Sequence, residues 1–214
     1  MKNKRFNNKY QFIVQNWGIL NVVKYIFKNI ISMNHYYVLE VNLKKVKNSS
    51  KTIINYEIGI LNENDIQKIL NMINELDEDS IKELLSRLIF EKVGFNEPYI
   101  VHNHNNKIAY IQWLIYPHEN NIINKHFSRK FYPLSENQVM VENAFTFPQF
   151  RGLGLMPAVT CDLLTIAKEA GYRSAICYIR KDRIAALNEF MKLGFKITKL
   201  TTEYKVFGFA WRTL

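Results

Sequence analysis

The stretch between residues 138 and 195 constrains the fold most, because strand-like and helix-like runs alternate in it. Apolar and β-branched runs predict the strands, and apolar residues at helical spacing predict the helices. The elements expected, in order, are Gln138–Phe147, Pro157–Ala170, Ser174–Ile179 and Ile184–Leu193. Gly171 and Gly194 directly follow the two helices, where glycine is common because it tolerates a left-handed backbone.

Similar patterns surround this stretch in a chain of 214 residues, of which 48% are apolar. One large domain with a sizeable core is therefore expected. The further elements predicted are a strand at Ile54–Leu61, a helix from Asn64 or Asp65 to about Leu76, a helix at Ser80–Ile89, a β-hairpin within Tyr99–Tyr116, and strands at Phe195–Leu200 and Glu203–Leu214. Alternation in Tyr36–Leu43 predicts one more strand, before a polar linker at Lys44–Lys51.

The turn between the first strand and the first helix of the alternating stretch is "FPQFRGLGLMPAV", Phe147–Val159. The first N–H groups of a helix have no intrahelical partner, and glycines let a backbone approach a pyrophosphate closely. Arg151 could add charge-assisted hydrogen bonds. The spacing is neither that of a dinucleotide fingerprint nor that of a P-loop. On the residues alone, a phosphate-binding loop and a plain tight turn both remain open.

A second motif, "MKLGF", follows about forty residues later. Together with "TFPQFRGLG" it resembles the GNAT superfamily of acyl-CoA-dependent N-acyltransferases, over roughly Ile53 to Leu214. The resemblance implies an α/β (α+β) GNAT fold, with a mixed central β-sheet flanked by helices. We expect two regions: a GNAT acyltransferase domain at 51–214, and a basic helix–strand extension at 1–50.

The resemblance also implies a co-substrate, acetyl-CoA or another acyl-CoA, and residues that would hold it. The strand end would pair with the pantetheine arm through main-chain hydrogen bonds, and the turn would bind the pyrophosphate through its backbone. These residues are Phe145, Thr146, Phe147, Arg151, Gly152, Leu153, Gly154, Leu155 and Met156. Met156 stands where the family has a small residue, and Met156-Pro157 resembles a branch associated with surface-sugar or natural-product pathways. A second frame, Gln149-x-x-Gly152-x-Gly154, also fits the bare pattern.

Acyl transfer to an amine benefits from a general base, because a free alkylamine is mostly protonated at pH 7. Glu142 is the candidate, since it lies mid-strand among apolar residues, where a buried carboxylate is costly. The alternative is an edge or solvent-facing Glu of an alternating strand.

The general acid is open. Where the family often has a tyrosine in the last helix, this chain has Phe190, and Arg183 falls where an asparagine is often found. Tyr178 or Tyr204 could protonate the leaving thiolate instead, as could water. We interpret Cys161 as a small buried residue of the cofactor helix.

The first 50 residues hold nine Lys/Arg and one acid, while the remaining residues are nearly balanced. Helical periodicity in Tyr10–Ile31 predicts an amphipathic helix. It could pack on the main domain, on a twin subunit or on an anionic membrane surface. Nucleic-acid binding is disfavoured, because the main domain carries no excess of basic residues.

Two cysteines without a CxxC motif fit a reducing cytoplasm and disfavour a disulfide framework or a zinc site. The tract "HNHNN" (His102–Asn106) is interpreted as a polar hairpin turn, and no metal is expected. The resemblance implies an N-acyltransferase acting on a primary amine of a small molecule or amino sugar, and the cysteine usage fits a cytoplasmic location. The alternative is a non-catalytic CoA-binding or scaffold module of the same fold.

Overall fold

The computed structural model describes residues 31–47, 52–206 and 209–213, with Gln15, Gly18 and Leu20 as single positions. These residues form one eight-stranded sheet with the order β2-β3-β4-β5-β6-β1-β7-β8. The strands are β1 (Ile31–Asn42), β2 (Tyr56–Ile60), β3 (Pro98–Asn103), β4 (Ile108–Ile115), β5 (Gln138–Thr146), β6 (Ser174–Arg180), β7 (Lys196–Val206) and β8 (Phe209–Arg212). Neighbouring strands are antiparallel except β5 and β6, which are parallel.

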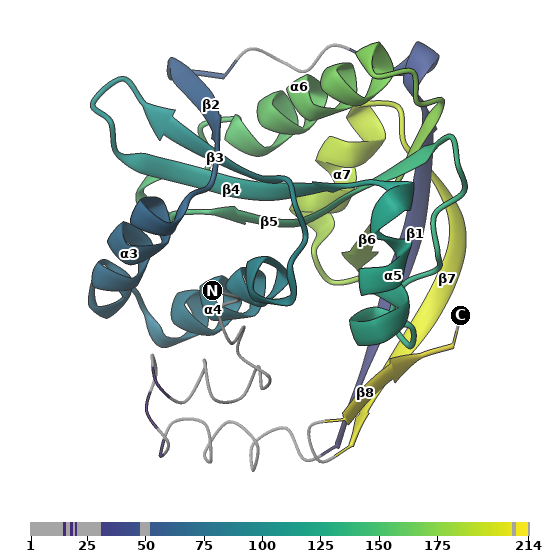
Figure 1. Cartoon of the computed structure of the whole chain (residues 1–214), viewed down its shortest axis with the longest axis horizontal. Coiled ribbons are helices and arrows are strands. Elements are labelled where there is room, and N and C mark those ends of the chain that lie inside the picture. The colour runs from purple at the N-terminus through teal and green to yellow at the C-terminus, as the bar shows by residue number, and fades with distance from the viewer. Residues whose placement is uncertain are drawn as a thin grey trace, which may run out of the picture.

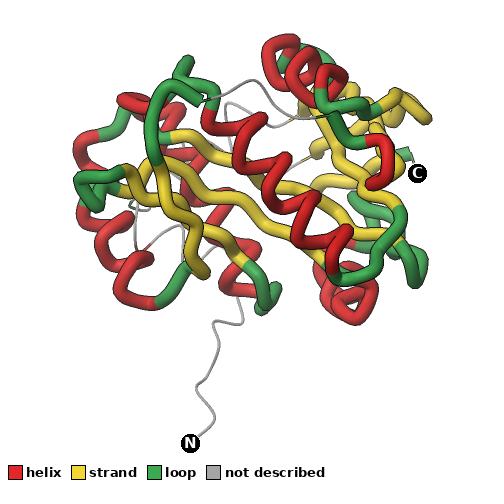
Figure 2. The backbone as a smooth tube through the Cα atoms, turned by 90° about the horizontal axis from the view of Figure 1, so that it is seen from above, coloured by secondary structure: helices red, strands yellow, loops and turns green. Residues whose placement is uncertain are grey.

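Helices cover both faces of this sheet (Figure 1). The helices are α3 (Glu63–Asn71), α4 (Glu78–Val93), α5 (Asn120–Ile122), α6 (Leu155–Glu169) and α7 (Ile184–Lys192). α6 and α7 lie on one face, and α3, α4 and α5 lie on the other. Figure 2 shows α6 crossing the strands obliquely, as expected for the helix that connects the parallel strands β5 and β6.

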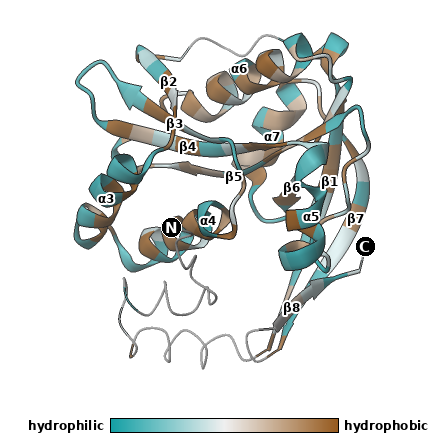
Figure 3. Ribbon diagram, in the orientation of Figure 1, coloured by the Kyte–Doolittle hydropathy of each residue, from teal (hydrophilic) through white to brown (hydrophobic). Residues whose placement is uncertain are grey.

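The core lies between these layers. Every residue of β4 is buried, and Trp113 and Tyr110 are among the largest side chains that are fully buried. Figure 3 shows that α4 and α6 each carry apolar and polar residues, as helices do when they cover a sheet with one face. The sheet and its helices were therefore predictable from hydrophobic patterning.

The helices α3 and α4 begin at residues suited to capping. The Asn62 side chain accepts the backbone N–H of Asp65, and the Asp65 carboxylate accepts the backbone N–H of Asn62. The two bonds form a capping box. Asp77 accepts the N–H of Ser80 at the start of α4, and Gly94 ends that helix with a left-handed backbone. α4 is thus fixed at both ends over the sheet.

Strand β1 precedes the expected division of the chain at residue 51, and it belongs to the same sheet as the strands that follow. β1 pairs with β6 on one side and with β7 on the other, so it lies inside the sheet. It begins at Ile31 and not at Tyr36, because its two neighbours supply partners along most of its length. Apart from Ile31 and the single positions Gln15, Gly18 and Leu20, the expected helix over Tyr10–Ile31 lies outside the described residues, and its dimer and membrane alternatives stay predictions.

The end of the chain also differs from expectation. We expected two strands with a break near Thr201, but β7 is continuous from Lys196 to Val206. It continues through Thr201 because residues 31–40 of β1 pair with it along its length. The segment between β4 and β5, for which we predicted no structure, contains α5 and a π-helix at Ile123–Phe127. Within the described part of the chain, no helix is both long and apolar enough to cross a bilayer.

The two helix-ending glycines allow a matched stability test. Gly171 and Gly194 both have left-handed backbones, with φ of +91° and +102°. A Cβ on Gly171 would meet no atom within 4 Å, whereas one on Gly194 would lie 3.1 Å from the Lys45 carbonyl oxygen. Gly171→Ala should lower the free energy of unfolding by about 1–2 kcal/mol, and Gly194→Ala should lower it by more. Urea unfolding of both variants measures the difference, and equal losses would contradict the Lys45 contact.

Candidate active site

The parallel strands β5 and β6 part shortly after they begin to pair. Their pairing covers only Gln138–Met140 against Ser174–Ile176. On its other side β5 stays paired with β4, but the register shifts between Ile111 and Trp113, and Asn143 of β5 has a left-handed φ of 65°. Such a bulge bends a strand and re-aims its side chains. A gap therefore opens between the carboxyl ends of β5 and β6.

Glu142 lies at the point where the two strands part. One of its carboxylate oxygens accepts the N–H of Tyr178 on β6 at 2.6 Å. The other accepts the N–H of its neighbour Asn143 at 3.1 Å. Burial raises the pKa of Glu142, while the charge of Arg212 and these two N–H groups act in the opposite direction. The sequence-predicted base is therefore a half-buried carboxylate at the start of the gap.

The bulge is also attached to helix α4. The side-chain amide of Asn143 donates to the carbonyl oxygen of Arg87 at 2.8 Å, and the Arg87 Nε donates to the carbonyl oxygen of Ala144 at 3.2 Å. These two bonds join consecutive residues of β5 to one residue of α4. The helix is thereby held against the strand just beyond Glu142.

A cavity of about 1110 Å³ extends from this point. Its walls come from α4, the parted strands β5 and β6, the π-helix region, and β1, β7 and β8. Glu142, Tyr178, Met156 and Phe190 all line it. The volume exceeds what a small ligand fills, so the space suits a long ligand together with a second reactant.

A buried charge cluster forms the far wall of the cavity. The Arg212 guanidinium lies 3.8 Å from the Tyr36 ring centre and 5.2 Å from that of Tyr178. Its Nε is 3.3 Å from the Glu203 carboxylate. Burial acts to raise the pKa of Glu203, but nearby cations, Lys130 foremost, outweigh it and lower that pKa. Sequence reasoning missed this cluster, because its members come from strands far apart in the chain.

The glycine turn leads from β5 into α6. Gly152 and Gly154 have left-handed φ values of 78° and 77°. α6 begins after Gly154 without a side-chain cap, so no side chain takes the position that an anion would occupy. The Leu153 carbonyl oxygen accepts from the Thr52 hydroxyl at 2.9 Å and from the Ile53 N–H at 3.2 Å. These two bonds fix the turn from outside, and binding of a phosphate at the turn stays a prediction.

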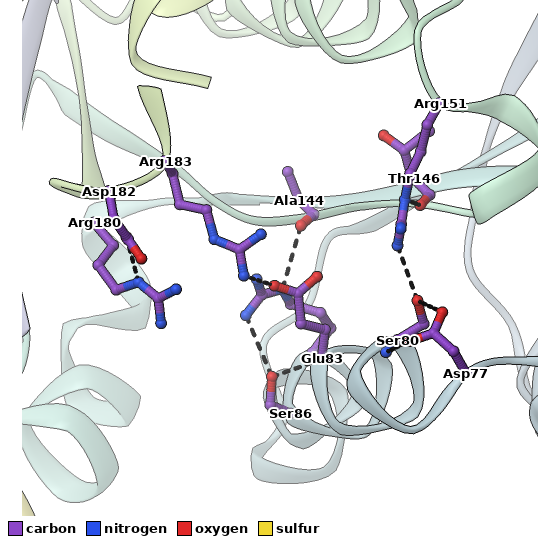
Figure 4. Close-up of polar contacts among 11 residues, drawn as sticks. Asp77, Ser80, Glu83, Ser86, Ala144, Thr146, Arg151, Arg180, Asp182 and Arg183 are labelled. Atoms are coloured by element: carbon purple, nitrogen blue, oxygen red, sulfur yellow. Dashed lines mark hydrogen bonds and ion pairs between the residues drawn. The ribbon is translucent and has the colours of Figure 1, made fainter. Parts of the chain in front are cut away.

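The side chain of Arg151 turns away from the glycines and towards α4 (Figure 4). Its Nε donates to the Thr146 carbonyl oxygen at 3.2 Å, and a terminal nitrogen donates to the Ser80 hydroxyl at 3.1 Å. Ser80 in turn donates to Asp77 at 2.6 Å. The charge-assisted contact we expected from this arginine is thus made within the protein.

Main-chain groups of alternate residues in β5 point in opposite directions. Phe145 is paired with Ile111, and the N–H of Phe147 donates to the Ala109 carbonyl at 3.1 Å, so both face β4. Phe145 and the N–H of Phe147 are thus turned towards β4, while the Phe147 carbonyl accepts the N–H of Phe150 at 2.9 Å, so these groups have partners within the protein and the expected pairing with a ligand stays a prediction. Ala144 and Thr146 are the residues whose carbonyls point away from β4.

The candidates for general acid separate in space. Tyr178 lines the cavity, and its hydroxyl accepts the N–H of Tyr132 at 3.0 Å. Burial first, and then the charge of Glu142, raise its pKa to about 12, so the hydroxyl keeps its proton at neutral pH. Tyr204 is 36% exposed and stacks on Trp211, and it does not line the cavity. Phe190 is buried against Phe195, with no proton to give.

Solved structures share this architecture. A glucosamine N-acetyltransferase region of a fungal multidomain β-N-acetylglucosaminidase aligns with a TM-score of 0.58 and 11% identity, over 85% of this chain and 22% of that one. A GCN5-related N-acetyltransferase from Sphaerobacter thermophilus gives 0.53 and 8%, over 89% and 57%. A GNAT-family acetyltransferase from Colwellia psychrerythraea gives 0.52 and 13%, over 96% and 75%.

The chain has the GNAT fold. This confirms the fold class that the sequence predicted, including the mixed sheet flanked by helices. The chain spans less than two thirds of the length of the first two of these structures. No protein-family model and no curated protein matches the sequence.

No metal centre emerges among the residues that the structure describes, where no three His, Cys, Asp or Glu side chains gather. His102 and Asn103 are the last residues of β3, and the rest of the "HNHNN" tract forms the hairpin turn to β4, as predicted. The Asn103 side chain accepts the N–H groups of Asn105 and Lys107 within that turn. Cys177 is buried, and Cys161 lies part-buried on α6.

Glu142→Gln should change how stability depends on pH. Because burial raises the pKa of Glu142 in the folded state, this group favours folding below its unfolded pKa, and the contribution is lost as pH rises through the folded pKa. The wild type should therefore lose stability over that interval, and the variant should lose less. Thermal unfolding between pH 4 and about pH 8 measures both curves.

The variant should also lose about 1–3 kcal/mol at acidic pH, because one oxygen of Glu142 becomes an amide nitrogen that cannot accept an N–H. Glu203→Gln is the matched control. The pKa of Glu203 is lowered in the folded state, so its contribution is lost as pH falls and not as pH rises. Parallel wild-type and Glu142→Gln curves would contradict the raised pKa.

Proposed function

We propose that the chain is an N-acyltransferase that moves an acetyl or other acyl group from acyl-CoA to a primary amine. The observation that carries the proposal is the gap between β5 and β6, with Glu142 at its start and the glycine turn of α6 at its end. An extended thioester could pass through the gap, with its pyrophosphate at the turn and its acyl group beside Glu142. The fold of the solved N-acetyltransferases supports acyl transfer.

The proposed reaction is a direct attack. The amine nitrogen bonds to the thioester carbonyl carbon, and the C–S bond breaks as the tetrahedral intermediate collapses. The amine proton passes to Glu142, directly or through a water molecule, because burial gives this carboxylate a raised pKa. The leaving thiolate takes a proton from Tyr178 or from water. The residues thus supply one base on β5 and one candidate acid on the neighbouring strand β6.

The acceptor is proposed only as a class. A primary amine on a small molecule fits the direct attack, and an amino sugar is the first candidate. The choice of an amino sugar rests on the Met156-Pro157 variant of the motif. It is also supported by one fold neighbour that is described as a glucosamine N-acetyltransferase region. Met156 lines the cavity beside the turn, so its side chain would lie near a ligand bound there.

Calorimetry with CoA and acetyl-CoA tests the cofactor. We expect binding to the wild type, and acetyl-CoA should be consumed when amino sugars and other primary amines are supplied. Glu142→Gln should keep CoA binding but lower kcat by about 10²–10⁴-fold, the range typical of a general base. Binding without turnover for every amine and for both proteins would favour the non-catalytic module. No binding at millimolar ligand would contradict the proposal.

Substituting Tyr178 and Tyr204 in turn tests which group acts as the general acid. Tyr178→Phe removes a hydroxyl inside the cavity, whereas Tyr204→Phe removes one outside it. If Tyr178 protonates the thiolate, its variant should lower kcat by at least about tenfold and change KM little, and Tyr204→Phe should match the wild type. Steady-state kinetics with a free-thiol assay measures both. Equal kcat in all three proteins would assign the proton to water.

A further inference from the structure

The edge of β5 that faces the gap is already occupied. Ala144 and Thr146 are the residues of β5 whose carbonyls point away from β4, and each carbonyl accepts an arginine Nε at 3.2 Å. The donors are Arg87 of α4 and Arg151 of the glycine turn. An extended ligand whose amide N–H groups pair with this edge has to compete for the same two oxygens.

An ion pair closes the gap beside this edge. Glu83 of α4 pairs with Arg183, which immediately precedes α7. The two helices lie on opposite faces of the sheet (Figure 1). Figure 4 shows the Arg183 side chain extending to Glu83, next to the dashed line that ends at the Ala144 carbonyl oxygen. This oxygen accepts the Arg87 Nε–H. Since Glu83, Ala144 and Arg183 all line the one cavity, their contacts lie where a ligand would pass between β5 and β6.

The two sets of contacts are coupled through charge. Glu83 lies one helical turn before Arg87 on α4, and Arg183 lies across the gap from it. The charges of both residues act on the Arg87 guanidinium. Arg87 also donates to the neighbouring Ser86 hydroxyl at 3.3 Å, which limits its freedom to swing away. Glu83 therefore pairs with Arg183 across the gap and acts on Arg87 through its charge.

We propose that Glu83, Arg87 and Arg183 form a latch across the gap, which the pantetheine arm of acyl-CoA displaces as its amide N–H groups take the Ala144 and Thr146 carbonyls. The inference rests on the proposed function for its ligand. The latch contacts exist only in the free protein, so they stabilise that state and oppose binding. Breaking one contact should lower the stability of the free protein and raise the affinity for CoA by a matching factor.

Calorimetry and stopped-flow mixing with CoA test the latch on the full chain. Glu83→Gln should bind CoA about twofold to fivefold more tightly than the wild type, as expected for a partly exposed ion pair. Arg87→Met, which keeps an unbranched stem without the Nε–H, should gain about fivefold. Both variants should bind faster, and their melting temperatures without ligand should fall. A merely structural residue would lower stability without raising affinity.

The charge-reversed pair Glu83→Arg/Arg183→Glu is the matched control. It restores the ion pair across the gap but not the favourable charge of Glu83 on Arg87, so it should return affinity and association rate part of the way from the Glu83→Gln values to those of the wild type. If Glu83→Gln and Arg87→Met bind CoA no more tightly and no faster than a wild type that does bind it, the latch is wrong and the proposed function stands. If the wild type binds no CoA, the proposed function fails and the latch fails with it. Should Arg87→Met not fold, Glu83→Gln and the reversed pair decide the question.

Discussion

The carboxylate of Glu142 accepts a backbone N–H from β6 and another from β5, and the shape of the site follows from these two bonds. Parallel strands normally continue their ladder, so strands that part leave main-chain groups without partners. At the first such position Glu142 takes the N–H of Tyr178, while the bulge at Asn143 turns the strand and exposes the N–H beside it. The carboxylate thus compensates for the lost ladder bonds. The gap, the cavity and the edge of β5 that no longer pairs with β6 all begin near this residue.

This double role constrains the chemistry proposed for the site. Backbone N–H groups stabilise the carboxylate as an anion, whereas burial favours its neutral form. Burial prevails, and the result is a carboxylate that accepts a proton more readily than one in water. Arg212 works in the other direction from the far wall, where three aromatic rings surround its guanidinium. The aromatic residues and Glu203 therefore bear on the basicity of Glu142 by holding that cation in place.

Local patterning was enough to predict most helices and strands, because each buries an apolar face. The glycine turn and Glu142 were also recognisable, since a glycine pair before a helix and an acid amid apolar residues are unusual in a sequence. What could not be predicted depends on contacts distant in the chain. Arg87, Glu83 and Arg212 look like ordinary surface charges until the topology brings them to one cavity. The orientation of the β5 carbonyls required the register with β4, which hydrophobic patterning alone leaves open.

The position of β1 has a consequence for how the molecule is made. Its partners lie at the other end of the chain: His35 contacts Thr202 across 167 residues, and Tyr36 lies opposite Arg180. On a ribosome β1 emerges early and has to wait until β6 and β7 have been synthesised. Such long-range pairing slows folding, because a large loop must close before any bond compensates for it. The sheet is therefore completed only after β7 has left the exit tunnel, and a nascent chain exposes the unpaired edges of β6 and β1 until then.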